Sequence, residues 1–149
     1  MFIYLAGPHV EDHAGSQGLI PEWRALFQAE LLRQRVRATC FDPWSAFGRT
    51  PDSLIPEASR IAVIAVNRAA IKACNVLVAN LSRRISLGTV REIEYARSLS
   101  KTVMILSGDR YPEISGSISS LDLRVYINAE DAVLAIQSLY RVKPAVRPF

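Results

Sequence analysis

The sequence predicts an α/β fold in which one doubly wound, mostly parallel sheet of five strands is flanked by helices. Its 149 residues suit one domain over residues 1–149. Five short apolar runs alternate with segments of helical periodicity, and each run is continuously apolar. Such runs are typical of strands that are buried on both faces of a parallel sheet. The pattern therefore favours a flavodoxin-like or Rossmann-like architecture.

The predicted strands are short apolar runs bounded by polar or turn-forming residues. In chain order they are residues 1–6 (MFIYLA), 37–41 (RATCF), 75–81 (NVLVANL), 102–107 (TVMILS) and 123–127 (LRVYI). Their spacing leaves room for a crossover helix between most successive strands, which is what parallel pairing requires.

The predicted helices are residues 21–35, 56–74, 88–100 and 128–140. In the first helix, apolar residues recur near the helical period, at Trp23, Leu26, Phe27, Leu31 and Leu32. Pro21 and Pro56 suit the first turn of a helix, and Asn128 suits an N-cap. The Pro-containing tail over residues 141–149 is predicted to be extended.

The chain is basic, with a net charge of +4 and an isoelectric point near 9.4. This balance predicts an anionic partner such as a nucleotide or a phosphate group. Lys and Arg are spread along the chain and are not interleaved with aromatic residues as in single-strand binding grooves. Nucleic acid binding therefore remains a minor hypothesis.

Composition argues against several other classes of protein. No apolar run approaches the roughly 20 residues of a membrane span, and the N-terminus does not resemble a signal peptide, so we expect a cytoplasmic protein without membrane association. Cys40 and Cys74 are not in CxxC spacing and are expected to be buried thiols. Because His9 and His13 are the only histidines, we expect no metal site, and no cofactor is predicted.

In doubly wound sheets, ligands bind outside the carboxyl ends of the strands, near the point where strand order reverses. This rule selects the loops after the first, third and fourth strands, residues 7–18, 82–88 and 107–117. The first and last of these loops are long and rich in Gly, Ser and Asp, as functional loops often are.

The segment RRISLGTVREIEYARSL (83–99) combines features of an anion site with a carboxylate. Ser86, Gly88 and Thr89 precede or open a helix, whose free N–H groups and dipole favour an anion, and Arg83 and Arg84 add positive charge. A plain helix cap and two solvated arginines would account for these residues equally well.

Glu92 lies one turn into this helix, so its carboxylate can point back toward the same crevice and act as a nucleophile. Glu94, two residues on, is expected to point away into solvent. Tyr4 lies on the first strand, shortly before Gly7, and its hydroxyl is placed to hydrogen-bond Glu92. A core tyrosine, and a glutamate that serves only the helix dipole, are the structural alternatives.

Three segments resemble the nucleoside 2-deoxyribosyltransferase superfamily: YLAGP near the N-terminus, NRAAIKACNVLVANL (67–81) and SLGTVREIEYARSLSKTV (86–103). The similarity runs in order over about residues 2–106. It implies a flavodoxin-like fold and either base exchange on 2′-deoxynucleosides or hydrolysis of nucleoside 5′-monophosphates. By this resemblance Glu92 is the nucleophile that forms a glycosyl–enzyme intermediate, and Tyr4 orients it.

The resemblance also implies that Gly7, Pro8 and Asn80 contact the substrate, together with the residues of the 83–89 segment. Two positions depart from the family pattern. Asn67 stands where family members usually carry an aspartate that protonates or orients the leaving base, and an amide cannot act as an acid. The acid then comes from Asp12, Asp42 or Glu94, or from water, or the protein does not catalyse the reaction.

The second departure is Ser86, which stands where the transferases commonly carry an aspartate for the sugar 5′-hydroxyl. The sequence Ser-Leu-Gly is the form found in the nucleotide hydrolases, where the serine binds the 5′-phosphate, whereas Gly88-Thr89 is transferase-like. Deoxyribosyl transfer is the first expectation, and a nucleoside 5′-monophosphate N-glycosidase or a non-catalytic nucleotide sensor are the alternatives.

The resemblance further implies a homo-oligomer, a dimer or larger, in which a neighbouring subunit helps to complete the active site. Residues after the fourth strand, among them Ser117, Ser119 and Tyr126, are the candidates for such a shared site.

Overall fold

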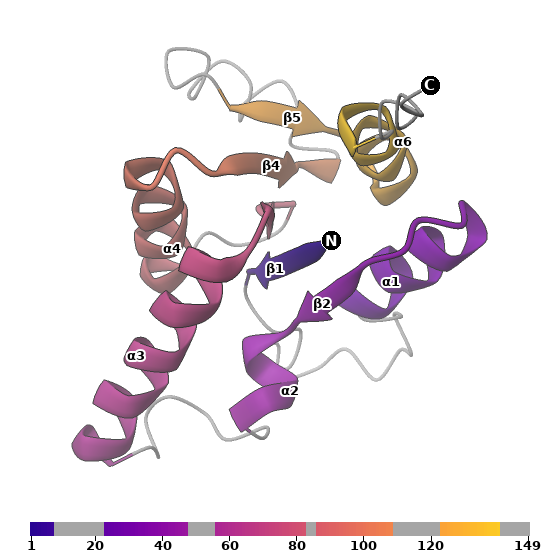
Figure 1. The fold of residues 1–149 in the computed structure, drawn as a ribbon. Coiled ribbons are helices and arrows are strands. Elements are labelled where there is room, and N and C mark those ends of the chain that lie inside the picture. The colour runs from indigo at the N-terminus through magenta and orange to yellow at the C-terminus, as the bar shows by residue number, and fades with distance from the viewer. Residues whose placement is uncertain (8–22, 48–55, 83–85, 109–122, 141–149) are drawn as a thin grey trace, which may run out of the picture.

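A computed structural model describes residues 1–7, 23–47, 56–82, 86–108 and 123–140. They form one five-stranded sheet in the order β2-β1-β3-β4-β5 (Figure 1). Every strand pair in it is parallel. The strands are β1 (Phe2–Ala6), β2 (Thr39–Phe41), β3 (Val76–Asn80), β4 (Thr102–Leu106) and β5 (Arg124–Tyr126). The predicted α/β class and doubly wound parallel sheet are confirmed.

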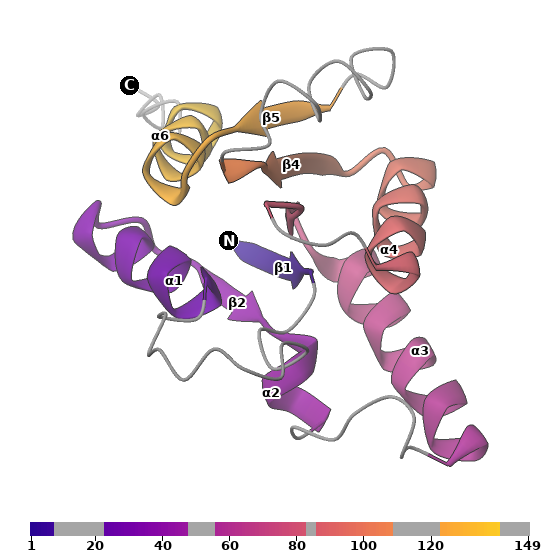
Figure 2. The ribbon, with the colours of Figure 1, turned by 180° about the vertical axis from the view of Figure 1, so that it is seen from behind.

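Helices cover both faces of the sheet, as Figures 1 and 2 show from opposite sides. The helices are α1 (Trp23–Arg33), α2 (Pro43–Phe47), α3 (Glu57–Ala73), α4 (Leu87–Ser98) and α6 (Ala129–Tyr140). α3 and α4 pack on one face through Ile71, Ile93 and Ala96, whereas α1 and α6 pack on the other through Phe27 and Ile136. The sheet is therefore wound on both sides.

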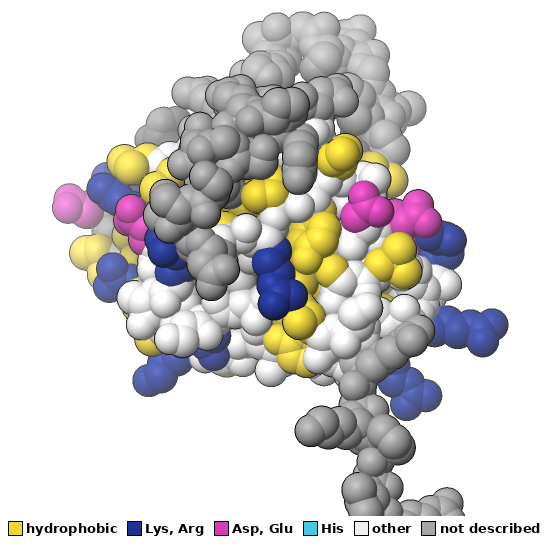
Figure 3. Space-filling model, turned by 90° about the horizontal axis from the view of Figure 1, so that it is seen from above, with side chains coloured by type: hydrophobic (Ala, Val, Ile, Leu, Met, Phe, Trp, Pro, Cys, Tyr) yellow, Lys and Arg dark blue, Asp and Glu magenta, His cyan; other side chains and the backbone are white. Residues whose placement is uncertain are grey.

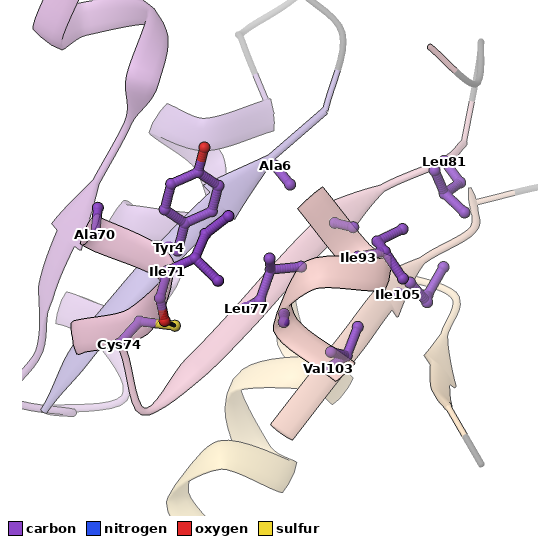
Figure 4. Close-up of a cluster of buried hydrophobic side chains, with 12 residues drawn as sticks. Tyr4, Ala6, Ala70, Ile71, Cys74, Leu77, Leu81, Ile93, Val103 and Ile105 are labelled. Atoms are coloured by element: carbon purple, nitrogen blue, oxygen red, sulfur yellow. Dashed lines mark hydrogen bonds between the residues drawn. The ribbon is translucent and has the colours of Figure 1, made fainter. Parts of the chain in front are cut away.

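Side chains of β1 alternate between the two layers. Tyr4 and Ala6 belong to the cluster beneath α3 and α4, which is drawn in Figure 4, while Ile3 and Leu5 belong to the cluster beneath α1 and α6. The same alternation places Leu77 with Tyr4. Since all of these side chains are almost fully buried, the continuous apolar runs predicted from sequence are explained by burial on both faces.

Several details predicted for the helices differ in the structure, among them their boundaries and the face of α1 that is buried. α4 begins at Leu87, one residue earlier than expected, and the short helix α2 was not predicted. In α1, Phe27 and Leu31 are buried as expected, but Leu26 and Leu32 are exposed. The N-cap prediction for Asn128 is confirmed, because its Oδ1 accepts the backbone N–H of Asp131 at 2.9 Å. The tail 141–149 lies outside the described residues.

We expect Leu77→Ala to lower the free energy of unfolding by about 2–5 kcal/mol, because it removes a fully buried side chain from a central strand. Chemical denaturation measures this value. Leu32→Ala is the matched control: Leu32 is 78% exposed, so its truncation should change stability by no more than about 0.5 kcal/mol. Equal effects of the two substitutions would contradict the described core.

Candidate active site

The carboxyl ends of β1 and β3 meet at the centre of the sheet. The chain leaves β1 toward β2 on one side and later returns through β3 on the other, so the strand order reverses between them. Gly7 follows β1, Asn80 ends β3, and α4 begins a few residues later. These positions form the switch point at which doubly wound sheets bind ligands.

The central contact of the site joins β1 to α4. The hydroxyl of Tyr4 donates a hydrogen bond of 2.6 Å to Oε1 of Glu92, across 88 positions of sequence. Tyr4 is fully buried, and the ring of Phe41 stacks on it with the centroids 5.6 Å apart. In Figure 4 its ring packs beside Ile71, and its hydroxyl points away from Cys74. Glu92 itself is half-buried, so its carboxylate is both held and reachable.

Burial raises the pKa of Tyr4 far above its ordinary value, and the charge and hydrogen bond of Glu92 raise it further. The hydroxyl therefore stays protonated throughout the working pH range and can act only as a donor toward the carboxylate. A short hydrogen bond to an ionised acceptor is stronger than one between neutral groups. Tyr4 thus fixes the orientation of Glu92.

Asn67 approaches the same carboxylate oxygen from α3. Its Nδ2 lies 3.4 Å from Oε1 of Glu92, a long hydrogen bond that adds a second neutral donor. Its Oδ1 is buried and has no hydrogen-bond partner in the described part of the chain. Because an unpaired buried acceptor is costly, this oxygen is a candidate partner for a donor group of a bound ligand.

The residues expected to bind substrate at the start of α4 also build the helix itself. Ser86 is the N-cap, and its Oγ accepts the backbone N–H of Thr89 at 3.1 Å and lies 2.8 Å from the Thr89 hydroxyl. Thr89 is only 2% exposed. Gly88 and Thr89 therefore lie in the first helical turn, within the helix that was predicted over residues 88–100. Gly88 remains exposed.

Asn80 and Gly7 fix the backbone turns that follow β3 and β1 at the switch point. The Oδ1 of Asn80 accepts hydrogen bonds from the backbone N–H and the hydroxyl of Ser82, at 2.9 and 2.6 Å, and so closes a tight turn after β3. Gly7 has φ of +147°, and a Cβ at this position would lie 3.2 Å from the Asn80 carbonyl oxygen and from the ring of Trp23. Glycine is thus required there to let the two turns come together.

Arg24 was missed by the sequence analysis. It is only 3% exposed, its guanidinium donates to the Gly7 carbonyl at 2.7 Å, and its Nε lies 2.9 Å from Oδ1 of Asp42. It therefore ties the turn after β1 to the residue that follows β2. Its position in the sequence did indicate burial, because residues 24, 27 and 31 lie on the same face of α1, the face that packs against the sheet.

The ion pair with Arg24 gives Asp42, one of the candidate acids, a structural role. Glu94 is exposed on α4, as expected. The remaining candidates lie outside the described residues: Pro8, Asp12, Arg83, Arg84, Ser117 and Ser119. Tyr126 ends β5, and its backbone carbonyl accepts the Ser107 hydroxyl at 3.0 Å.

Three further features of the described segments concern metal ligands, membrane spans and thiols. These segments contain no cluster of three or more His, Cys, Asp or Glu side chains that would suit a metal ion, and no helix in them is long and apolar enough to cross a membrane. Burial, and to a smaller extent the charge of Asp42, raises the pKa of the Cys40 thiol to about 11, and burial also raises that of Cys74. Neither thiol is therefore set up as a nucleophile.

The fold is shared with solved structures. A conserved protein from Enterococcus faecalis superposes with a TM-score of 0.60 at 20% identity, over 93% of this chain and 98% of that one. The 2-desoxiribosyltransferase from Leishmania mexicana superposes with a TM-score of 0.56 at 18% identity, over 95% of this chain and 99% of that one. The CMP N-glycosidase of Clostridium botulinum superposes with a TM-score of 0.51 at 14% identity, over 92% of this chain and 99% of that one. At such identities the likeness shows the fold alone.

Sequence comparison identifies the family. No curated protein matches the chain in a direct search. The family model described as nucleoside 2-deoxyribosyltransferase matches residues 3–130, which include Tyr4, Asn67 and Glu92. This is most of the chain and includes four of the five strands whole and β1 from Ile3 onward. The chain therefore belongs to the nucleoside 2-deoxyribosyltransferase family, whose members are enzymes that act on nucleosides or nucleotides.

Proposed function

We propose that this protein is a nucleoside 2-deoxyribosyltransferase that cleaves the N-glycosidic bond of a (deoxy)nucleoside or nucleotide with Glu92 as the nucleophile. The observation that carries the proposal is the 2.6 Å hydrogen bond from the buried Tyr4 hydroxyl to Glu92 at the switch point of the sheet. A carboxylate that is held by a neutral donor keeps its charge and its direction. Both properties are needed for attack on a sugar carbon.

The reaction takes place in two displacements. In the first, a carboxylate oxygen of Glu92 bonds to the anomeric carbon, the bond from that carbon to the base nitrogen breaks, and its electron pair leaves with the base. In the second, a ring nitrogen of another base attacks the same carbon and loses its proton to solvent, and the ester bond to Glu92 breaks to regenerate the carboxylate. An ionised carboxylate beneath the sugar also stabilises the oxocarbenium-like transition state of each step.

Protonation of the leaving base is assigned to solvent. Asn67 lies beside Glu92 where a second carboxylate would otherwise act, and an amide N–H is too weakly acidic to protonate a base. Its unpaired Oδ1 can instead accept a hydrogen bond from the sugar or the base. The same amide supports the alternative of a nucleotide sensor, which would bind the ligand at this site and leave the glycosidic bond intact.

Hydrolysis of a nucleoside 5′-monophosphate is the second catalytic candidate, and Ser86 favours it. Ser86 stands at the N-terminus of α4, where backbone N–H groups and the helix dipole attract an anion. Glu92 lies six positions further along the chain, which is about 9 Å along a helix axis. That spacing suits a sugar with its anomeric carbon over Glu92 and its 5′-substituent toward the helix start.

Polynucleotide binding is less well supported. On the face of the molecule shown in Figure 3, the described Lys and Arg side chains are scattered, and exposed apolar side chains lie between them. Proteins that hold nucleic acid gather their positive charge along one surface. The small positive excess is instead consistent with a single nucleotide as the ligand.

The proposal is tested by incubating the protein with deoxynucleosides and deoxynucleoside monophosphates, with and without a free acceptor base. We expect base exchange with an acceptor, and we expect Glu92→Gln to lower turnover by about a thousandfold or more, because the nucleophile is lost. Glu94→Gln, an exposed carboxylate two residues away, is the matched control and should retain activity.

A glycosyl adduct on Glu92, detected by mass spectrometry after acid quenching, would identify the intermediate directly. Full turnover by Glu92→Gln would refute the assigned nucleophile. Free base released only from monophosphates would establish the hydrolase, and tight nucleotide binding with no turnover of any substrate would establish the sensor.

Tyr4→Phe should lower kcat/KM by about 10- to 100-fold, since a hydrogen bond to a charged group contributes about 1.5–3 kcal/mol. The substitution keeps the ring that packs in the core, so the protein should remain folded, which a thermal melt verifies. Tyr140→Phe removes an exposed tyrosine hydroxyl, which donates to the Asn75 carbonyl, and should leave turnover unchanged. Unaltered kcat/KM in Tyr4→Phe would argue against an orienting role.

Ser86→Asp and Ser86→Asn distinguish the two catalytic candidates. Both side chains are good N-caps, so both variants should preserve α4 and the stability of the fold. If Ser86 faces a 5′-phosphate, the aspartate should weaken turnover of monophosphates by like-charge repulsion while the isosteric asparagine should not. Equal behaviour of the two variants toward nucleosides and monophosphates would remove Ser86 from the phosphate site.

A further inference from the structure

A buried charged pair lies at the edge of the sheet where β1 and β2 end, close to the proposed nucleophile. The side chains of Arg24 on α1 and Asp42 after β2 are only 4% and 8% exposed, and the Arg24 Nε lies 2.9 Å from the Asp42 Oδ1. Taking two charges out of water is costly, and apolar residues of similar volume often stabilise a fold as well or better. Stability alone therefore does not account for this pair.

The first contact of Arg24 is with the backbone segment that carries Tyr4. Its guanidinium donates to the carbonyl of Gly7 at 2.7 Å, three residues after Tyr4. Gly7 has a φ of +147°, so the chain turns sharply out of β1 at this residue. The donor at this carbonyl fixes the direction in which the segment leaves the strand.

The second contact of Arg24 bears on the same tyrosine from the neighbouring strand. Asp42 directly follows Phe41, which is the register partner of Tyr4 and stacks on its ring with the centroids 5.6 Å apart. In Figures 1 and 2, α1 lies next to β2 from both sides of the molecule. One guanidinium thus joins the turn after Tyr4 to the residue that follows its stacking partner.

The charge of Arg24 also reaches the Tyr4 hydroxyl. Burial raises the pKa of Tyr4, as do the charge and hydrogen bond of Glu92, and the positive charge of Arg24 opposes them. The same hydroxyl donates to Oε1 of Glu92 at 2.6 Å. A cation that acts on this hydroxyl also favours the ionised form of the carboxylate beside it.

We propose that Arg24 is a positioning residue for the proposed reaction: it holds Tyr4, and Tyr4 holds the carboxylate of Glu92. The inference rests on the proposed function for its effect on turnover, whereas the alignment of the Tyr4 hydroxyl exists without substrate. A guanidinium is required because its planar fork of donors reaches two partners at once. Lysine carries the same charge but lacks this fork, so it cannot keep both contacts.

Turnover tests the proposal with Arg24→Lys. This variant should lower kcat by at least about tenfold, with a smaller change in KM, because the nucleophile is misaligned. In a Tyr4→Phe background, Arg24→Lys should change kcat by less than about twofold, since the hydroxyl through which it acts is already absent. Arg33→Lys is the matched control: Arg33 lies on the same helix, its side chain is 59% exposed, and kcat should not change.

A second readout does not depend on turnover. A buried hydroxyl that donates a short hydrogen bond to a carboxylate should give a downfield proton NMR signal, which is assigned to Tyr4 by its loss in Tyr4→Phe. Arg24→Lys should shift this signal upfield or broaden it, and Arg33→Lys should leave it in place. A wild type without turnover would refute the proposed reaction, while the NMR signal would still decide the role of Arg24.

A further variant guards against a failure of Arg24→Lys to fold, which circular dichroism detects. Arg24→Gln combined with Asp42→Asn removes both charges together and so leaves no unpaired buried charge. It should show the same loss of kcat and the same displaced signal. Folded variants that retain both kcat and the hydroxyl signal would overturn the proposal. Equal effects of Arg24→Lys in the presence and absence of the Tyr4 hydroxyl would also overturn it.

Discussion

The hydrogen bond between Tyr4 and Glu92 is the contact on which the organisation of the site depends. It joins β1 to the helix that follows the neighbouring strand β3, and it can form only if β1, β3 and α4 keep their relative positions. Burial makes the tyrosine a permanent donor. The fold thus converts a flexible surface carboxylate into a fixed one, which is what a nucleophile for a sugar carbon requires.

Around this contact, several residues stabilise the local structure. Ser86 caps α4, Asn80 closes the turn after β3, and Arg24 ties Gly7 to Asp42. None of these roles needs a ligand. They hold the ends of β1 and β3 and the start of α4 in place, so the polar groups there are positioned before any ligand binds. Preorganised polar groups contribute to catalysis because they do not have to reorient during the reaction.

The fold was largely predictable because strands that are buried on both faces are continuously apolar in sequence. Runs such as VLVAN in β3 have no polar alternation, and parallel pairing follows from that. The exposure of Leu26 and Leu32 was not predictable from periodicity, since α1 covers the sheet with a narrow stripe through Phe27 and Leu31. The helix α2, with five residues, is too short to show a periodic pattern.

The site was predictable only in part, and the reason is that its contacts are long-range. Family resemblance suggested that Tyr4, Asn67 and Glu92 act together, and the structure brings the three side chains within hydrogen-bonding distance. Their catalytic roles stay predictions. Arg24 escaped notice because an arginine in a helix is usually solvated, and only its tertiary partners, the Gly7 carbonyl and Asp42, reveal that it is buried.

The main chemical question of the site is why an amide, Asn67, stands where an acid is expected. A carboxylate at this position would stand close to Glu92, and two close carboxylates resist joint ionisation. An amide avoids that repulsion and donates to Oε1 instead. In the proposed mechanism, the chain thus has a hydrogen-bond donor to the nucleophile at a position where an acid would otherwise stand. In the proposed mechanism, this arrangement suits a base that departs without strong protonation by the protein.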